Sequence, residues 1–381
     1  MPSREDLTPS LLTGDTIAGI PVITVTGTPH TMGKSIGQRL SARIRTLIQD
    51  RLALLRRLSP ILDGSQDRQA LRRDQELINE RIGTCADRLA TAAPPLWMEC
   101  KGLLEACQLS VEELLIAAAF SDLLGLFETP VPAADSSVII LPRQATDHEN
   151  SILCMTWMLP PDTVPHLVLL RRIPDHGPST LTLTIAGLWP VAGISESGLA
   201  VASNELRVNN GCSGGIPTQF QIAGMLDAPS FDDACFRAKV SPRLGGRAFH
   251  LLHRHGGRQS IEGSGQRSVV LPDPQADIAR IHTNHILDQD LQTDEAKPQD
   301  PTSRPRLGRL ARLARQCCHC DPSQIDEMIG QDLSLHGDKA FFDVDDQWQQ
   351  RIAAQIILDP AHRCLWIHRG PSPAPLEVAE L

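Results

Sequence analysis

Three short groups of side chains in this sequence have types and spacings that could carry out chemistry. Asp135-Ser136-Ser137 places a carboxylate and two hydroxyls directly before the apolar run Val138-Ile139-Ile140-Leu141. His282-Thr283-Asn284-His285 and Cys317-Cys318-His319-Cys320 are the other two groups. A carboxylate can act as a general acid or base and an activated hydroxyl as a nucleophile, whereas imidazoles and thiolates also bind metals. The surrounding sequence decides between these uses.

The spacing of the cysteines and histidines does not predict a metal site. A structural zinc ion needs four converging donors, usually supplied as two pairs, and Cys317 and Cys320 form one pair with no second pair after them. His282 and His285 have a spacing of three, which a metal pair tolerates, but two histidines alone cannot hold a metal. We therefore expect no metal, and a helix end with partly buried thiols at Cys317 to Cys320.

The sequence before Asp135 predicts one strand followed by helices. Residues 21–26 are rich in β-branched side chains and end in the turn Gly27-Thr28-Pro29, as a strand does. Apolar residues then recur at helical spacing from Ile36 to Leu58, with charged residues on the opposite face. Two further helices are expected over residues 66–92 and 95–127.

From Ser136 onward the pattern changes to short strands. Apolar runs separated by proline and glycine predict antiparallel strands at 138–141, 152–157, 167–170, 181–185 and 199–202. Later segments predict a helix over 218–240, strands near 269–271 and 281–283, a polar loop over 287–305, helices over 303–316 and 322–331, and a hairpin of 355–358 with 364–367. This order of helices and strands indicates a layered α+β fold.

Three motifs, in this order and spacing, resemble the isopenicillin N acyltransferase family. They are Gly27-Thr28-Pro29-His30-Thr31-Met32-Gly33-Lys34-Ser35-Ile36-Gly37, Gly193-Ile194-Ser195-Glu196-Ser197-Gly198-Leu199-Ala200-Val201-Ala202-Ser203-Asn204 and Ile281-His282-Thr283-Asn284-His285. Gly214-Gly215-Ile216-Pro217-Thr218 and Glu262 also match family positions. The resemblance implies the Ntn-hydrolase fold, a four-layer αββα sandwich, here with an N-terminal helical segment. It further implies a pro-segment-like region over residues 1–134 and the sandwich core over 135–381, joined in one integrated domain.

The same resemblance implies a chemistry and its residues. In the family, a cysteine freed by self-cleavage attacks an amide or thioester carbonyl, and its own α-amino group is the general base. Asn204 matches the asparagine that stabilises the oxyanion, and Asn284 is a second candidate for this task. Taken alone, Asn204 could also be a turn residue at the end of a strand. The residues expected to contact the substrate are Trp157, Met158, His282 and His285.

The nucleophile position departs from the family pattern. Counted without gaps, the family cysteine falls on Asp135, and a shift of one residue places Ser136 there. Serine is a legitimate nucleophile when its own amine activates it, whereas Asp135-Ser136-Ser137 also suits a simple turn before a strand. A deliberate replacement of cysteine by serine would give the same sequence. Whether the chain cleaves itself stays open.

Two further groups of the family pattern are absent from the expected places. Thr156-Trp157-Met158 resembles a Thr-Trp-Asp signature in which a thioether has replaced the orienting carboxylate. The late family arginine would fall near residues 340–343, which read Ala-Phe-Phe-Asp, so we expect Asp135 to lie beside Trp157 and Met158 with no arginine nearby.

Two functions stay open on this evidence. The first is an acyltransferase or amide hydrolase that acts on a small N-acyl amine or acyl thioester, with Ser136 as nucleophile. The second is an uncleaved relative that binds a small ligand or uses Asp135 as an acid or base.

Composition narrows the range of partners. A net charge of -9 does not fit a nucleic-acid-binding protein. No apolar run approaches the length of a membrane span and no secretory leader is apparent, so we expect a cytoplasmic protein without membrane contact and with reduced thiols. The expected partner is a small-molecule substrate. No cofactor is expected, although acyl-CoA or another acyl thioester could be the co-substrate, and assembly into a homo-oligomer stays open.

Overall fold

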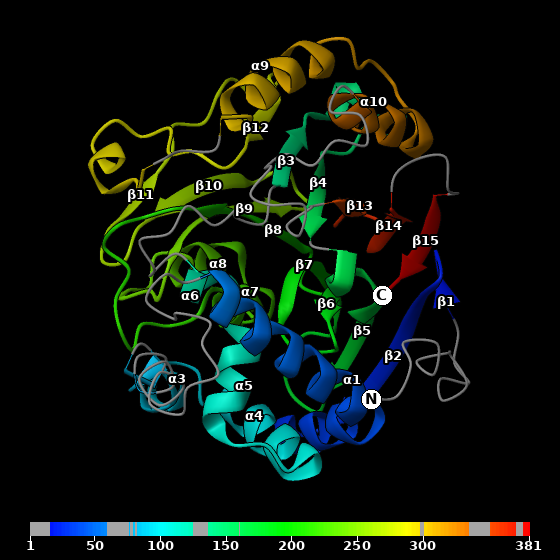
Figure 1. The fold of residues 1–381 in the computed structure, drawn as a ribbon. Coiled ribbons are helices and arrows are strands. Elements are labelled where there is room, and N and C mark those ends of the chain that lie inside the picture. Colours follow the sequence, from blue (N-terminus) through cyan, green and yellow to red (C-terminus); the bar gives the residue numbers. More distant parts are fainter. Residues whose placement is uncertain are drawn as a thin grey trace.

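Two β-sheets form the centre of the protein in a computed structural model that describes residues 16–58, 76, 79–80, 82–124, 136–159, 161–297, 301–334, 351–370 and 376–381 (Figure 1). The nine-stranded sheet has the order β1 (Thr16–Ile17), β2 (Ile20–Gly27), β5 (Leu167–Pro174), β6 (Thr180–Ile185), β7 (Pro190–Ser195), β8 (Leu199–Leu206), β9 (Gly246–His253), β10 (Arg258–Gly263) and β11 (Ser268–Val270). The six-stranded sheet has the order β12 (Arg280–His282), β3 (Ser136–Leu141), β4 (Ile152–Leu159), β13 (Arg351–Asp359), β14 (Cys364–Arg369) and β15 (Glu377–Glu380).

Neighbouring strands in both sheets are antiparallel, as predicted for the strands after Ser136, with one exception. The N-terminal strand β2 pairs in parallel with β5, so that Val22 lies opposite Leu169 and Thr26 opposite Ile173. Residues on either side of position 135 therefore share the nine-stranded sheet.

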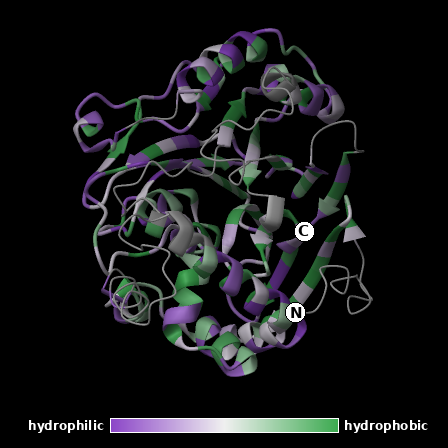
Figure 2. Cartoon of the chain, viewed as in Figure 1, coloured by the Kyte–Doolittle hydropathy of each residue, from purple (hydrophilic) through white to green (hydrophobic). Residues whose placement is uncertain are grey.

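The two sheets pack face to face, and the alternation of side chains along each strand divides the core. On β8, Ala200 and Ala202 belong to the large apolar cluster that also contains Val138 and Ile140 of β3. Leu199 and Val201 point the other way and pack with helical residues in a second cluster. Figure 2 shows hydrophobic segments along the central strands and hydrophilic residues along the outer helix α9 (Ser303–Ala314).

Helices cover the outer faces of both sheets, which completes the predicted four-layer αββα sandwich. The helices α9 and α10 (Pro322–Ser334) pack against the six-stranded sheet through Leu310, Ile325 and Ile329, whereas α7 (Thr218–Leu226) and α8 (Phe231–Arg237) cover the nine-stranded sheet. The short 3-10 helices are η2 (Arg143–Ala145), η3 (Pro161–His166) and η4 (Leu291–Asp294), the last within the predicted polar loop.

The helical stretch predicted over residues 218–240 is present as two helices, because the chain breaks between α7 and α8. Pro229 disfavours helical backbone at the residue before it, and Ser230 then begins α8 by accepting a hydrogen bond from the backbone N of Asp233 at 3.2 Å. The break gives two short helices, with Asp227 at the turn between them.

The N-terminal helices also differ from the prediction. They are α1 (Pro29–Leu58), α3 (Cys85–Ala92), α4 (Pro94–Cys107), α5 (Val111–Ala118) and α6 (Phe120–Leu124). The single helix predicted over 95–127 is wrong: Gln108 ends α4 with a φ of 52°, and Ser110 and Glu113 form a capping box that starts α5. Part of the helix predicted over 66–92 lies outside the described residues. Although α1 has 30 residues, no described helix is both long and apolar enough to cross a membrane.

The helices α1 and α4 cross at very short distance because each has a glycine at the contact. A Cβ atom on Gly33 would lie 1.9 Å from the carbonyl oxygen of Glu99, and one on Gly102 would lie 2.0 Å from the carbonyl oxygen of His30. Any larger residue would push the helices apart. This contact fixes the position of Glu99, whose side chain binds Arg172 on β5.

Candidate active site

Ser136, one of the two nucleophile candidates, begins β3 and is almost fully buried, at 3% exposure. Its side chain points between the two sheets, because it shares a face of β3 with the core residues Val138 and Ile140. The next residue, Ser137, points to the other face, toward α9. Asp135 lies outside the described residues, so its predicted environment stays a prediction.

Asn204 is the principal contact of Ser136. It lies within β8 and is fully buried, so the interpretation of Asn204 as a strand-end turn residue is wrong. Its Nδ2 donates to Ser136 Oγ at 2.7 Å and to the Ser136 carbonyl oxygen at 3.0 Å. A carbonyl oxygen can only accept, so this pair of contacts fixes the orientation of the amide and aims its N–H bonds at the serine.

Two histidines hold the opposite side of this amide. Asn204 Oδ1 lies 3.0 Å from His250 Nε2 and 3.1 Å from His282 Nδ1, and the two rings are 5.0 Å apart between centroids. Because the oxygen accepts, both ring nitrogens must carry hydrogen. Burial, together with the charges of His282 and Arg280, lowers the pKa of His250 well below its usual range, so His250 is neutral and its Nδ1 accepts from Ser260 Oγ at 2.8 Å.

Glu262 completes the chain of contacts behind Asn204. Its Oε1 lies 2.7 Å from His282 Nε2, and the backbone N–H groups of Leu287 and Asp288 donate to its two carboxylate oxygens at 2.7 and 2.9 Å. Burial raises the pKa of Glu262, but the hydrogen bond and charge of His282 and the two backbone donors outweigh this and lower the pKa below its ordinary value. Glu262 is therefore ionised, and His282 donates to oxygen from both of its nitrogens.

Asn284 faces Ser136 with its oxygen, contrary to the expectation that it could donate to an oxyanion. Asn284 Oδ1 accepts from the backbone N of Ser136 at 2.9 Å, and its Nδ2 donates to the carbonyl oxygen of Glu205 at 3.1 Å. The donors are thus directed away from the serine. Asn284 instead positions the nitrogen of Ser136, the atom that would become an α-amino group if the chain were cut before this residue.

An arginine lies beside Ser136, and it comes from a segment other than residues 340–343, where the family arginine was expected. Arg306, on the first turns of α9, is 1% exposed. Its Nη1 donates to the Ser136 carbonyl oxygen at 3.0 Å and to Ser137 Oγ at 3.1 Å, and its Nη2 donates to Asn284 Oδ1 at 3.0 Å. One guanidinium thus joins β3 to the loop after β12.

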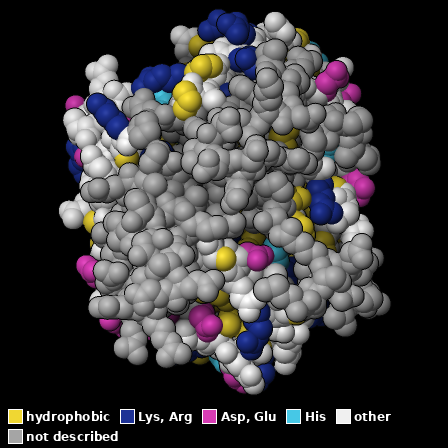
Figure 3. Space-filling view, in the orientation of Figure 1, with side chains coloured by type: hydrophobic (Ala, Val, Ile, Leu, Met, Phe, Trp, Pro, Cys, Tyr) yellow, Lys and Arg dark blue, Asp and Glu magenta, His cyan; other side chains and the backbone are white. Residues whose placement is uncertain are grey.

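The spacing of apolar residues in the sequence of α9 could have indicated Arg306, although no family motif points to it. Arg306, Leu310 and Ala314 recur at helical spacing and are all buried, so the arginine lies on the apolar stripe of α9. Of the other arginines of α9, Arg304 and Arg312 are exposed and Arg309 is half-buried. Figure 3 shows Lys and Arg side chains at the top of the visible face, where Figure 1 places α9. A charged residue on the apolar face of a helix indicates a functional site more directly than the distance of that residue from a family motif.

Of the other residues expected to contact the substrate, Trp157 is a neighbour of Ser136, whereas Met158 and His285 lie elsewhere. Trp157 lies opposite Ser136 on β4 and is buried in the core between the sheets. Met158, one residue on, points to the other face of the same strand. His285 Nδ1 lies 2.7 Å from Ser303 Oγ at the start of α9, and burial, with the nearby charge of His282, lowers the pKa of His285 to about 4.

The cysteine group is a helix end with partly buried thiols, as predicted. Cys317 and Cys320 follow α9 and are half-buried, and Cys317 Sγ lies 3.0 Å from Met328 Sδ on α10. Within the described residues, no three His, Cys, Asp or Glu side chains are grouped so that they could hold a metal ion.

A comparison with protein families shows to which family this chain belongs. Residues 146–372 match the model of the family described as acyl-coenzyme A:6-aminopenicillanic acid acyl-transferase. The chain belongs to this acyl-transferase family. The match covers more than half of the chain and includes Asn204, Glu262, the segment His282 to His285, and Arg306. It begins after Ser136 and therefore gives no information about the residue at the nucleophile position.

Solved structures of low sequence identity resemble this chain over much of its length. A mutant of conjugated bile acid hydrolase from Clostridium perfringens has 8% identity and a TM-score of 0.43, covering 65% of this chain and 92% of that one. A Caenorhabditis elegans N-acylethanolamine-hydrolyzing acid amidase ortholog has 10% identity and a TM-score of 0.40, covering 65% and 99%. Penicillin V acylase from Agrobacterium tumefaciens has 10% identity and a TM-score of 0.41, covering 64% and 84%. No curated protein matches the sequence.

The stability of this protein should depend on Glu262 with a defined pH profile. A carboxylate whose pKa is lowered by folding stabilises the protein above its ordinary pKa of 4.5, and this contribution is lost as the pH falls through the folded value. Glu262→Gln should therefore lower the free energy of unfolding at pH 7 by about 1 to 3 kcal/mol. The difference from the unsubstituted protein should shrink below pH 4.5. Urea unfolding followed by circular dichroism between about pH 3 and 8 measures both values.

Glu295 provides the matched control for this measurement. It is also buried, and its Oε1 accepts from the backbone N of Ile286 at 2.8 Å in the same loop. Here burial is the largest effect and raises the pKa of Glu295, so its ionised form is disfavoured by folding. Glu295→Gln should consequently have the opposite pH trend. Equal trends for the two variants would contradict the assignment of Glu262 as a buried, ionised partner of His282.

Proposed function

We propose that this protein transfers an acyl group from a small N-acyl amine or acyl thioester to water or an amine, with Ser136 Oγ as the nucleophile. The observation that carries the proposal is the hydrogen bond of 2.7 Å from Asn204 Nδ2 to Ser136 Oγ, at the start of a buried strand. It brings a hydroxyl together with an oriented amide donor in a site enclosed by two sheets. Such a donor stabilises the charge that develops on a carbonyl oxygen under attack.

The general base in this proposal is the α-amino group of Ser136 after cleavage of the bond to Asp135. In the uncut chain the same nitrogen donates to Asn284 Oδ1 at 2.9 Å. Arg306 donates to that oxygen as well, so its positive charge lies close to the nitrogen. A neighbouring cation favours the neutral form of an amine, which is the form that can remove the serine proton.

The chemical steps follow from these positions. Ser136 Oγ forms a bond to the acyl carbon while its proton moves to the amine of the same residue, and the carbonyl oxygen becomes an oxyanion near Asn204 Nδ2. The carbon then releases an amine or a thiol, which takes the proton. Water or an acceptor amine finally attacks the Ser136 ester and restores the hydroxyl. The family name makes an acyl-coenzyme A donor one of the thioesters to test.

Mass spectrometry tests the proposal directly. The purified protein is measured intact, and then after incubation with a p-nitrophenyl ester and with a simple acyl thioester. We expect a fragment that begins at Ser136 and carries an acyl group on that residue. Ser136→Ala should abolish the adduct, whereas Ser137→Ala should retain it, because the Ser137 side chain points to the opposite face of β3. A chain that stays uncut and unlabelled would contradict the proposal.

One observation favours a second candidate, an uncleaved relative that binds a ligand or uses Asp135 in acid or base chemistry. Ser136 is 3% exposed, and its backbone N–H is already engaged by Asn284. In this case Asp135→Asn would reduce activity or ligand affinity while Ser136→Ala would have little effect. The opposite ranking would favour the serine nucleophile.

A further inference from the structure

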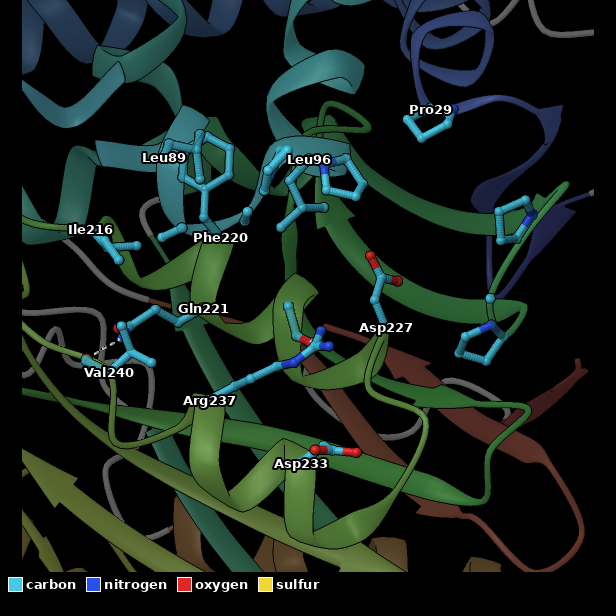
Figure 4. Close-up of a pocket in the computed structure, with 18 of the residues that line it drawn as sticks. Pro29, Leu89, Leu96, Ile216, Phe220, Gln221, Asp227, Asp233, Arg237 and Val240 are labelled. Atoms are coloured by element: carbon cyan, nitrogen blue, oxygen red, sulfur yellow. Dashed lines mark hydrogen bonds between the residues drawn. The ribbon is translucent and has the colours of Figure 1, made fainter. Parts of the chain in front are cut away.

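A second candidate site lies on the helical side of the nine-stranded sheet. It is a cavity of about 600 Å³ between the starts of α1 and α4, the end of α3, the pair α7 and α8, and the turn from β5 to β6 (Figure 4). None of the residues that line it contacts Ser136. On β8, Asn204 points toward the six-stranded sheet, whereas Leu199 and Val201 pack with α7 and α8, so the sheet separates the two sites.

The walls of the cavity are mostly apolar and rigid. Five prolines line it, together with aromatic and aliphatic side chains; they include Pro94, Pro95 and Pro178 and, from the helices, Met32, Leu96 and Phe220. A cavity of this volume with apolar walls and a few polar groups is typical of a binding site for a small organic molecule.

The polar wall carries an excess of negative charge. Arg172 is 7% exposed, and its guanidinium binds two carboxylates, Glu99 through Nη2 and Asp227 Oδ1 through Nη1 at 2.9 Å. One positive and two negative groups leave a net charge of -1 in this cluster. At the rim, Arg237 and Asp233 have opposite charges and cancel. With both carboxylates ionised, the cluster beside the cavity therefore has one more negative group than positive groups.

The three members of this cluster differ in access to the cavity. Glu99 is 3% exposed and held by the glycine contact between α1 and α4, whereas the Asp227 side chain is 24% exposed. Figure 4 shows the Asp227 carboxylate directed from the turn after α7 into the space below Leu96. Among the described residues, none donates a hydrogen bond to Asp227 Oδ2, so this oxygen is available to a ligand.

Two more observations agree with a missing cation. Burial raises the pKa of Glu99, Arg172 opposes the rise and the charge of Asp227 adds to it, so a further cation beside this cluster would favour the ionised form of Glu99. Gln221 also lines the cavity; its Nε2 donates to the carbonyl oxygen of Val240, and its buried Oε1 has no hydrogen-bond partner in the described structure. Asp227 Oδ2 thus offers an acceptor to the cavity, and a ligand with N–H donors would satisfy it.

We propose that this cavity binds a small organic ammonium ion, with its apolar body among the prolines and Phe220 and its N–H groups donating to Asp227. The ammonium supplies the positive charge that the cluster of Glu99, Arg172 and Asp227 lacks. This site is independent of acyl transfer at Ser136.

Isothermal titration calorimetry with three matched probes tests the chemical class. The probes are 2-phenylethylammonium, 2-phenylethanol and phenylacetate, which share an aromatic ring and differ in charge. We expect the ammonium to bind at least tenfold more tightly than the alcohol, because it makes a charged hydrogen bond to Asp227, and the anion to bind most weakly. Equal affinity for ammonium and alcohol, or no saturable binding of the ammonium at millimolar concentration, would overturn the proposal.

Two pairs of variants locate the binding. Asp227→Asn retains an oxygen for Arg172 and removes the charge, so it should erase the preference for the ammonium. Asp232→Asn, on α8 outside the cavity, should leave this preference unchanged.

A Cβ on Gly224 of α7 would meet no atom within 4 Å, so Gly224→Leu should fill the cavity and abolish binding without unfolding the chain. Gly308→Leu on α9, equally unhindered, is the control. Unchanged binding in Asp227→Asn and Gly224→Leu, with the melting temperature retained, would place the ligand elsewhere.

Discussion

Replacing Asn204 by alanine should lower acyl transfer per folded molecule by about a hundredfold or more, because the substitution removes the amide that is aimed at Ser136 Oγ. The rate is measured with the ester and thioester substrates, after the folded fraction of each preparation has been determined by circular dichroism. A rate per folded molecule that is unchanged would exclude Asn204 as the oxyanion donor.

The same substitution should also destabilise the protein, a consequence that the sequence did not reveal. Asn204 is fully buried and contacts the Ser136 carbonyl oxygen, His250 and His282. Each buried polar group left without a partner costs about 1 to 3 kcal/mol. Asn210→Ala is a suitable control, since the Asn210 side chain is hydrogen-bonded to Ser264, Gly265 and Asp294 and makes no hydrogen bond with Ser136 among the described residues. It should lose stability and retain the rate.

Substitution of Arg306 should have a similarly large effect, and two variants separate its charge from its geometry. Arg306→Lys retains the charge but cannot reproduce contacts to the Ser136 carbonyl, Ser137 and Asn284 at once. Arg306→Met is of similar length and loses the charge as well. We expect both to reduce the rate by about a hundredfold, since misplacement of reacting groups by about 1 Å can have this effect.

The pH profile distinguishes the two Arg306 variants. If the α-amino group of Ser136 is the base, the nearby guanidinium keeps it neutral at lower pH. Arg306→Met removes this positive charge, so the pKa of the amine should rise and the acidic limb of the rate profile should move to higher pH. Arg306→Lys retains the charge and should move the limb little. Arg304→Lys, two residues away on the exposed side of α9, is the control and should change neither the rate nor the limb. Identical profiles for the Lys and Met variants would show that the charge does not act on the base.

The sequence predicted the layered fold because its strongest local patterns agree with it. β-branched runs between prolines and glycines gave most strands of both sheets, and the spacing of apolar residues gave α1, α9 and α10. The breaks inside helices were harder to predict, because Gln108 and Ser110 interrupt a run whose apolar spacing continues through both sides of the break. A change of backbone conformation at one residue does not alter the spacing of apolar residues, so this spacing does not predict the break.

The site was predicted less completely, because its contacts connect residues that are distant in the chain. The motif match indicated Asn204 and the segment from His282 to His285, and it placed Ser136 near them. It could not show which atom each amide presents: Asn204 faces the serine with nitrogen and Asn284 with oxygen, and only the surrounding donors and acceptors decide this. His250 was missed, since a single histidine in an apolar strand resembles ordinary core.

The parallel pairing of β2 with β5 has a consequence for synthesis on the ribosome. β2 ends at Gly27, whereas β5 begins only at Leu167. At a translation rate of about 5 to 20 residues per second, β2 waits roughly 7 to 30 s for its partner to be made. During this interval Ile20, Ile23 and Val25, which are buried in the finished protein, have no sheet to join. The nascent N-terminal strand therefore exposes apolar side chains until β5 has been made.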